Sequence, residues 1–201
     1  MNNKLKLIFI FFFIALSSST QADYKISSAQ DYVSLIAQET INILGNKEQN
    51  IEDKINNISN IFLSNLAVRE ISLFVLGPYR RNLTTDQTEE YINLIKRFVS
   101  EIYSIRLASF PNGAFTIVNA TDNGRSGIIV KTLIQFEGNK NPTKIDWRII
   151  KNQNNEFKVF DIRVIGVWMA QEQRSTFTSF LSKNNGDVDK LMFKLKEQFN
   201  N

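Results

Sequence analysis

Four consecutive segments with strand-like patterning constrain the fold of this chain most strongly. They are rich in β-branched and aromatic residues and cover residues 114–121, 128–136, 143–150 and 157–164. The connectors between them contain turn-forming Asn, Asp, Gly and Pro residues, as in Asp122-Asn123-Gly124. Because connectors of hairpin length join neighbouring antiparallel strands, the pattern predicts an antiparallel meander.

Helical periodicity flanks the strand region on both sides. Apolar residues recur at helical spacing between Ser27 and Gly45, over residues 49–63, before Gly77-Pro78, and over residues 85–108, 170–184 and 187–199. Ser27-x-x-Gln30 and Asp86-x-x-Glu89 are candidate caps for the first and longest helices. The order predicts one α+β domain. In it, several helices pack against a twisted antiparallel sheet of four strands, with room for a fifth.

The first 22 residues resemble a targeting segment. Lys4 and Lys6 precede the uninterrupted apolar run 7–16, and small or polar residues follow up to Ala22. The run is shorter than the roughly 20 residues that a membrane-spanning helix needs. We therefore expect a cleaved signal peptide over residues 1–22 and a single domain over residues 23–201. An exported chain without cysteine fits the bacterial periplasm.

The chain contains neither cysteine nor histidine. The first absence excludes disulfides, thiolate nucleophiles and cysteine zinc sites, and the second excludes a Ser-His-Asp triad and the commonest metal ligand. The formal net charge of +4 includes Lys4 and Lys6, so the remaining chain is too weakly basic to indicate nucleic-acid binding. We expect no enzyme activity, no metal site and no cofactor.

The strand region is more apolar than a sheet with one buried face requires. Ile128, Ile129 and Val130 are consecutive, and residues 157–165 place apolar groups at both odd and even positions. Two interpretations remain open. Either helices cover both faces of the sheet, or part of this surface lines a cavity for an apolar ligand.

Several short motifs, taken in order, resemble the MlaC family of toluene-tolerance auxiliary proteins. They are Leu76-Gly77-Pro78-Tyr79-Arg80, Phe98-Val99-Ser100-Glu101-Ile102-Tyr103, Ile145-Asp146-Trp147-Arg148, residues 157–167 and Arg174-Ser175-Thr176-Phe177. The resemblance runs from about Ala29 to Leu195. Phe157, Ile165 and Trp168 stand where the family usually has Trp, Glu and Ser.

This resemblance implies a soluble periplasmic phospholipid carrier without catalytic activity. Such carriers shuttle lipids between an outer-membrane lipoprotein complex and an inner-membrane ABC transporter with an MCE-domain subunit, and so contribute to outer-membrane lipid asymmetry. The implied fold is a twisted antiparallel sheet backed by helices, with acyl chains in an apolar cavity between them. The phospholipid is cargo rather than a cofactor.

The physics of apolar burial fits this role. Each buried CH₂ group is worth about 0.8 kcal/mol, so exposing a tail of roughly 16 carbons to water costs on the order of 12 kcal/mol. A carrier that offers a pocket of similar polarity removes this cost without any catalytic residue.

We expect the acyl-chain pocket to combine helix and sheet positions. The candidates are Phe74, Tyr79, Phe98, Tyr103, Val130, Ile134, Phe136, Trp147, Val159 and Val164. At each position an ordinary core role is the alternative.

Three other functions remain open at this point. A periplasmic chaperone or carrier of lipoproteins or hydrophobic solutes shares the leader and the apolar excess. A histidine-free enzyme requires a buried acid such as Asp146 or Asp161 facing a cleft, whereas we expect both acids to point outward or to pair with Arg148 and Arg163. An interaction module with a filled core would bind no ligand.

Overall fold

The computed structural model describes residues 17–199, with side chains from residue 23. Residues 1–16, which form most of the predicted signal peptide, lie outside the described residues. The helices are α1 (Ser17–Gly45), α2 (Ile51–Asn65), α3 (Val68–Val75), η1 (Gly77–Asn82), α4 (Thr85–Phe98), η2 (Val99–Tyr103), α5 (Ser104–Ala108), η3 (Gly124–Ser126), α6 (Met169–Lys183) and α7 (Val188–Glu197). The strands are β1 (Gly113–Asp122), β2 (Ile128–Phe136), β3 (Thr143–Lys151), β4 (Phe157–Val164) and β5 (Val167–Trp168).

The strands form one antiparallel sheet in the order β1-β2-β3-β4-β5, so the predicted α+β meander is confirmed. The predicted bounds of β2 and β4 are those observed, and the fifth strand is the short β5. Two bulges interrupt the ladders, one between Ile117 and Asn119 on β1 and one opposite Arg148 and Ile149 of β3. Bulges increase the local twist of a sheet, and these two help it to curve around the helices.

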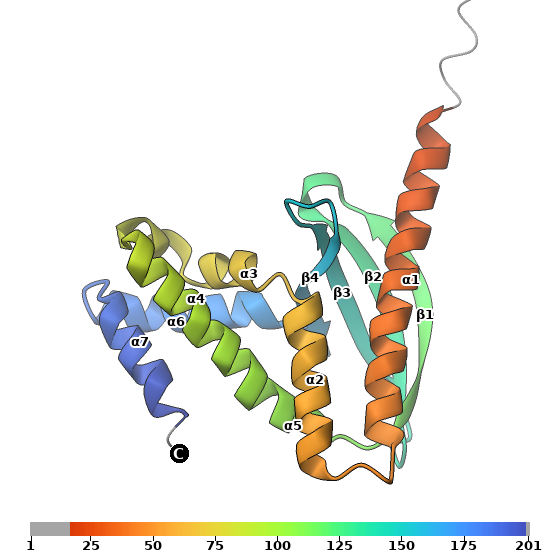
Figure 1. The fold of residues 1–201 in the computed structure, drawn as a ribbon. Helices are drawn as coiled ribbons and strands as arrows, with labels where there is room; N and C mark the ends of the chain where they lie inside the picture. The colour runs from red at the N-terminus through yellow and green to blue at the C-terminus, as the bar shows by residue number, and fades with distance from the viewer. Residues whose placement is uncertain (1–16, 200–201) are drawn as a thin grey trace, which may run out of the picture.

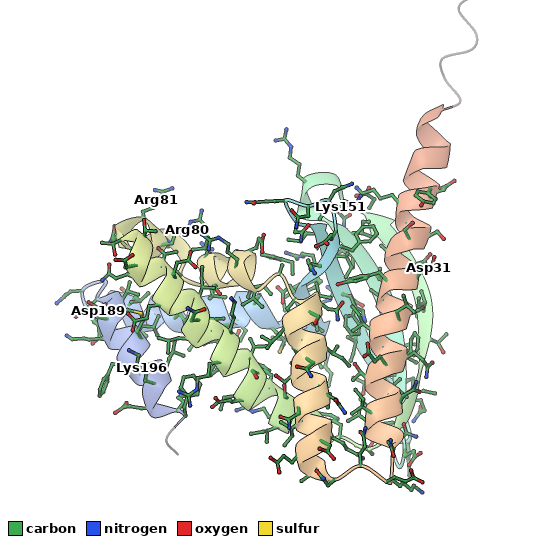
Figure 2. All side chains as sticks on the ribbon, viewed as in Figure 1. Asp31, Arg80, Arg81, Lys151, Asp189 and Lys196 are labelled. Carbon is green, nitrogen blue, oxygen red and sulfur yellow. The ribbon has the colours of Figure 1, made fainter. Side chains whose placement is uncertain are left out.

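The larger helices form two groups, and α2 belongs to the group that lies against the sheet. In Figure 1, α1 and α2 stand side by side along the sheet, and α3, α4, α6 and α7 form a separate helical group beyond α2. One apolar cluster joins α1 and α2 to the sheet, and another fills the helical group. Arg80 and Arg81 lie at the end of that group far from the sheet (Figure 2). Within residues 17–199, no helix combines the length and apolar content that crossing a membrane requires.

The start of α1 differs from the sequence prediction. The helix is continuous from Ser17 to Gly45, so Ser27-x-x-Gln30 lies inside it and does not cap it. The neighbouring Ser28 hydroxyl instead donates to the Tyr24 carbonyl at 2.8 Å, one turn back in the same helix. Serine makes such bonds inside helices as well as at their ends, and for this reason the motif did not locate the boundary.

The predicted helix over residues 85–108 is also different. It consists of α4, the π-helical turn η2 and the short helix α5. Its N-terminal cap is Thr84 rather than Asp86. The Thr84 hydroxyl accepts from the Gln87 backbone N–H at 3.2 Å, and the Gln87 side-chain carbonyl accepts from the Thr84 N–H at 3.1 Å. A π-helical turn widens the helix locally, and such turns often occur at functional sites.

A tight turn connects β4 to β5. Ile165 and Gly166 both adopt positive φ angles, of 49° and 88°. This conformation is unusual for a β-branched residue, and the Ile165 side chain is 78% exposed. The turn returns the chain so that Val167 pairs with Val164, and α6 begins immediately afterwards.

Removing the Thr84 cap should weaken the helical group. In Thr84→Ala the Gln87 backbone N–H loses its acceptor, and we expect the free energy of unfolding to fall by about 1 kcal/mol in urea denaturation. Thr85→Ala is the matched control, because Thr85 is exposed at the first helical position and makes no capping bond. Equal losses in the two variants would contradict this account of the helix start.

Candidate apolar binding site

An apolar cavity lies between the sheet and the helices that cover it. This sheet cavity has a volume of about 180 Å³ and is bounded by α1, α2, α5 and the inner face of β2, β3 and β4. Its walls are almost wholly aliphatic and aromatic. The polar lining side chains are Thr40 of α1 and Asn65 of α2.

A second apolar cavity lies on the other side of α2. This helix cavity has a volume of about 140 Å³ and is formed by α2, α3, the end of α4, η2, β4 and the start of α6. Phe62, Leu66 and Ile162 line both cavities. These three side chains, which we call the shared wall, are therefore what separates the two spaces.

A bulge in β4 allows this strand to serve both cavities. Val159 pairs with Ile149 and Asp161 pairs with Arg148, so Phe160 has no residue opposite it on β3. An unpaired residue shifts the alternation of side chains along a strand. As a result Val159, Ile162 and Val164 line the sheet cavity, whereas Phe160 and Asp161 line the helix cavity, which Ile162 also borders.

This arrangement explains the apolar excess of the last long strand. The α2 helix packs against β4 beside the sheet cavity, and α3 and α6 pack against it beside the helix cavity. The first interpretation, helices on both faces, is confirmed for β4, and the binding of a ligand in the spaces beside it stays a prediction. Helices cover its two sides, and an apolar space remains on each side.

Seven of the ten predicted pocket residues lie around the cavities. Phe98 and Tyr103 line the helix cavity. The residues that line the sheet cavity are Ile134, Phe136, Trp147, Val159 and Val164. Contact of any of these residues with a ligand stays a prediction.

The other three predicted residues line neither cavity. Phe74 packs edge-on against Phe160, with ring centroids 5.2 Å apart, and so supports the helix cavity from behind. The Tyr79 ring packs beside Gly186, in the turn between α6 and α7. Val130 is fully buried in the core between α1 and the sheet.

Sequence reasoning missed the contribution of the first two helices. The pocket prediction contained no residue of α1 or α2, yet Ile36 and Ile41 line the sheet cavity and Phe62 and Leu66 belong to the shared wall. The apolar stripes of these helices were visible in the sequence. However, periodicity shows that a helix buries one face and does not show which strands that face meets.

The buried polar groups next to Trp147, in the wall of the sheet cavity, satisfy one another. The Trp147 indole N–H donates to the Thr132 hydroxyl at 3.0 Å, and this hydroxyl donates to the Ile145 carbonyl at 2.9 Å. A buried polar atom without a partner costs free energy and attracts water. The chain of two bonds therefore keeps the wall near Trp147 effectively apolar.

The two candidate acids have structural partners. Asp146 forms an ion pair with Arg163, as expected. Asp161 does not point outward or form an ion pair, which corrects the sequence expectation. It is buried in the wall of the helix cavity, where its Oδ1 accepts from the backbone N–H groups of Ala170 at 2.8 Å and Ile162 at 2.9 Å. Burial raises the pKa of Asp161. Its lone pairs fix the start of α6 against β4.

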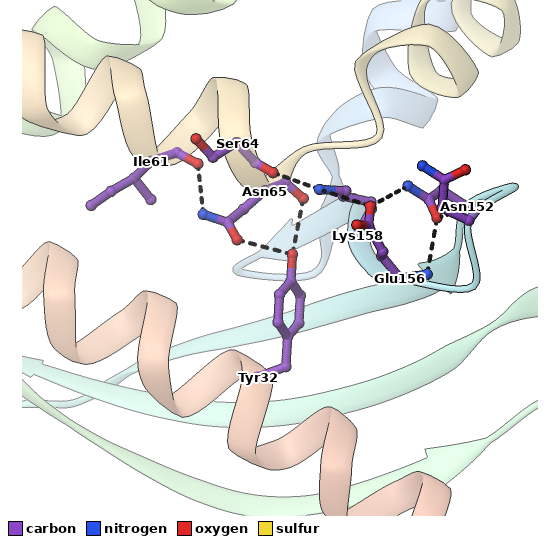
Figure 3. Close-up of polar contacts among 8 residues, drawn as sticks. Tyr32, Ile61, Ser64, Asn65, Asn152, Glu156 and Lys158 are labelled. Atoms are coloured by element: carbon purple, nitrogen blue, oxygen red, sulfur yellow. Dashed lines mark hydrogen bonds and ion pairs between the residues drawn. The ribbon is translucent and has the colours of Figure 1, made fainter.

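One end of the α1–α2 pair is closed by a polar link (Figure 3). The Tyr32 hydroxyl of α1 lies 3.1 Å from Asn65 Oδ1 and 3.2 Å from the Asn65 carbonyl. The Asn65 amide donates to the Ile61 carbonyl at 2.9 Å, and Lys158 of β4 donates to the Ser64 carbonyl at 2.8 Å. These bonds tie the end of α2 to both α1 and the sheet. Burial raises the pKa of Tyr32 to about 12.

The Tyr32 link should make stability depend on alkaline pH. The folded-state pKa of Tyr32 lies above its ordinary value of 10.0, so its stabilisation is complete below that pH and is lost as pH rises toward about 12. We expect the free energy of unfolding to fall more steeply above about pH 10 in the native protein than in Tyr32→Phe. Chemical denaturation across this range measures both slopes. Tyr24→Phe, at a 75% exposed position, should keep the native slope.

Truncation of the shared wall should join the two cavities. In Phe62→Ala the ring between them is removed, and we expect the lipid-free protein to lose about 1–3 kcal/mol of unfolding free energy, because Phe62 is half-buried. Phe193→Ala on α7, where the side chain is 63% exposed, should change stability by less than about 0.5 kcal/mol. A neutral effect of Phe62→Ala would show that the ring does not separate two packed spaces.

A twisted meander backed by helices, with two adjoining apolar cavities between the layers, defines a class of α+β domains built around an internal apolar pocket. The family described as "MlaC protein" matches residues 35–197 of this chain. The chain belongs to the MlaC family.

A solved structure supports the fold independently. It is the phospholipid-binding protein from Ralstonia solanacearum, determined in complex with a phospholipid. The likeness has a TM-score of 0.71 at 20% sequence identity and covers 84% of this chain and 95% of that one. No curated protein matches the sequence.

Proposed function

We propose that this protein is a periplasmic phospholipid carrier that holds acyl chains in the sheet cavity and the helix cavity. The observation that carries the proposal is the pair of adjoining apolar cavities in a chain of the MlaC family. The complex of the Ralstonia solanacearum protein with a phospholipid supports it, because that protein has the same fold.

The sizes of the cavities imply that the protein opens when it is loaded. The volumes of about 180 and 140 Å³ are each below the roughly 300–1,000 Å³ typical of ligand pockets. Displacement of the shared wall, Phe62, Leu66 and Ile162, would connect them into one longer space. Acyl chains entering from either side would then replace the contacts that these side chains make with one another.

Such a carrier needs no catalytic group. Each CH₂ group that passes from one apolar environment to another leaves the free energy nearly unchanged, whereas passage through water costs about 0.8 kcal/mol per group. The hydrogen bonds of Asp161 and the ion pair of Asp146 give these acids structural roles. We therefore infer a binding protein rather than an enzyme.

We further propose that the carrier moves lipids across the periplasm. Its partners would be an outer-membrane lipoprotein complex and an inner-membrane ABC transporter with an MCE-domain subunit. Export would depend on the signal peptide, which would be cleaved after Ala22. Membership of the MlaC family supports this role, and a carrier of lipoproteins or other hydrophobic solutes is the alternative that ligand identity distinguishes.

Native mass spectrometry of the exported protein, purified without detergent, tests the proposal. We expect a stoichiometric adduct of phospholipid mass, confirmed by extraction and lipid mass spectrometry. A lipid-free mass that persists after incubation with phospholipid vesicles would overturn the proposal. An adduct of another mass would favour the alternative carrier.

A charge placed in the sheet cavity should prevent loading. In Val164→Arg a guanidinium enters the space that an acyl chain would fill, and we expect at least a tenfold loss of bound lipid. Val118→Arg is the matched control, because Val118 is 55% exposed on β1. If circular dichroism shows that Val164→Arg does not fold, Val164→Phe narrows the same space without adding a charge. A folded variant with undiminished lipid would contradict the assignment of this cavity.

A further inference from the structure

A polar groove runs between α1 and α2, directly beside the sheet cavity. The groove has a volume of about 480 Å³ and lies where Figure 1 shows the two helices side by side. Its polar walls come mainly from Glu39, Asn42, Asn46, Asn57, Asn60 and Ser64. Ile61 and Asn65 line both the groove and the sheet cavity, so the two spaces adjoin.

Polarity increases from the sheet cavity toward this groove. The strands contribute apolar side chains to the sheet cavity, whereas its polar lining residues, Thr40 and Asn65, come from α1 and α2. In the sequence these residues directly neighbour Glu39 and Ser64, which line the groove. A molecule with apolar tails in the cavity and a polar end at the groove would match this gradient.

The groove side chains have unused hydrogen-bonding capacity. Among the described groove residues, Glu39 carries the only charge, and it has no ion-pair or hydrogen-bond partner within residues 23–199. The side-chain amides of Asn57 and Asn60 likewise make no hydrogen bond within that range. The buried Gln49 Oε1 accepts none there. The groove therefore offers amide donors together with carboxylate and amide acceptors.

Two lysines near the helix ends are already engaged. Lys54 Nζ donates to the Leu44 carbonyl at 3.0 Å. Lys158 Nζ donates to the Ser64 carbonyl at 2.8 Å and lies 3.8 Å from a Glu156 carboxylate oxygen. A phosphate in the groove would thus meet amide N–H groups, while the unpaired Glu39 carboxylate would attract a cation.

We propose that this groove binds the headgroup of a zwitterionic, ammonium-bearing phospholipid. The Asn57 and Asn60 amides donate to its phosphate, and Glu39 pairs with its ammonium. This assignment rests on the proposed function, since it places the acyl chains in the sheet cavity. The groove would give the protein a preference for one headgroup. The apolar cavities alone cannot provide this preference, because they contact only acyl chains, which phospholipids with different headgroups share.

A competition between two headgroups tests the assignment. Delipidated protein is incubated with vesicles that contain equal amounts of phosphatidylethanolamine and phosphatidylglycerol with identical acyl chains, and the lipid it takes up is quantified by mass spectrometry. We expect about two- to fivefold enrichment of phosphatidylethanolamine, the range that a solvent-accessible ion pair provides. The enrichment should decrease with added salt.

Glu39→Gln should abolish the enrichment of phosphatidylethanolamine, because the amide carries no charge to pair with the ammonium. Asp31→Asn is the matched control, because Asp31, labelled in Figure 2, is an exposed acid of α1 that does not line the groove. Uptake of lipid in the vesicle ratio, or an unchanged preference in Glu39→Gln, would overturn the headgroup assignment while leaving the carrier function intact. Failure of the native protein to take up any lipid would overturn both.

Discussion

The unpaired residue Phe160 in β4 is the feature on which the two-cavity architecture depends. It shifts the alternation of the strand, so that β4 presents aliphatic side chains to the sheet cavity and an aromatic ring to the helix cavity. In a regular strand Phe160 would share a face with Ile162 and Val164, and Val159 would point to the opposite face, because successive side chains alternate. The unpaired residue instead leaves Val159 with Ile162 and Val164 in the sheet cavity and turns Phe160 toward the helical group. Asp161, the next residue, holds the start of α6 in place through its bonds to backbone amides.

Much of the fold followed from the sequence because its strongest signals are local. Hairpin-length connectors specified the meander, and the bounds of β2 and β4 were predicted to the residue. Where two local structures satisfy the same pattern, prediction failed. Ser27-x-x-Gln30 is compatible with a cap and with a helix interior, and apolar residues over 85–108 are compatible with a regular helix and with one containing a π-helical turn.

The site was less predictable than the fold because it is built from long-range contacts. The prediction included cavity-lining residues on the strands and around the π-helical turn, because aromatic and β-branched side chains mark buried positions in a sequence. Phe62 and Leu66 were missed, because their importance arises from the position of α2 between the sheet and the helical group. Val130 is the opposite case, because it was predicted to line the pocket. It is fully buried in the core and lines neither cavity.

The sequential order of the strands has a consequence for how the chain folds. Every strand pairs with its neighbour in the sequence, so the sheet forms by closing short loops, which costs little chain entropy. Docking of α1 is the opposite case, since its Lys25 pairs with Asp122, 97 residues later. Contacts of low sequence separation generally form first. We therefore expect the meander to assemble early and α1 to close over it late, so that the sheet cavity is the last part of the core to be enclosed.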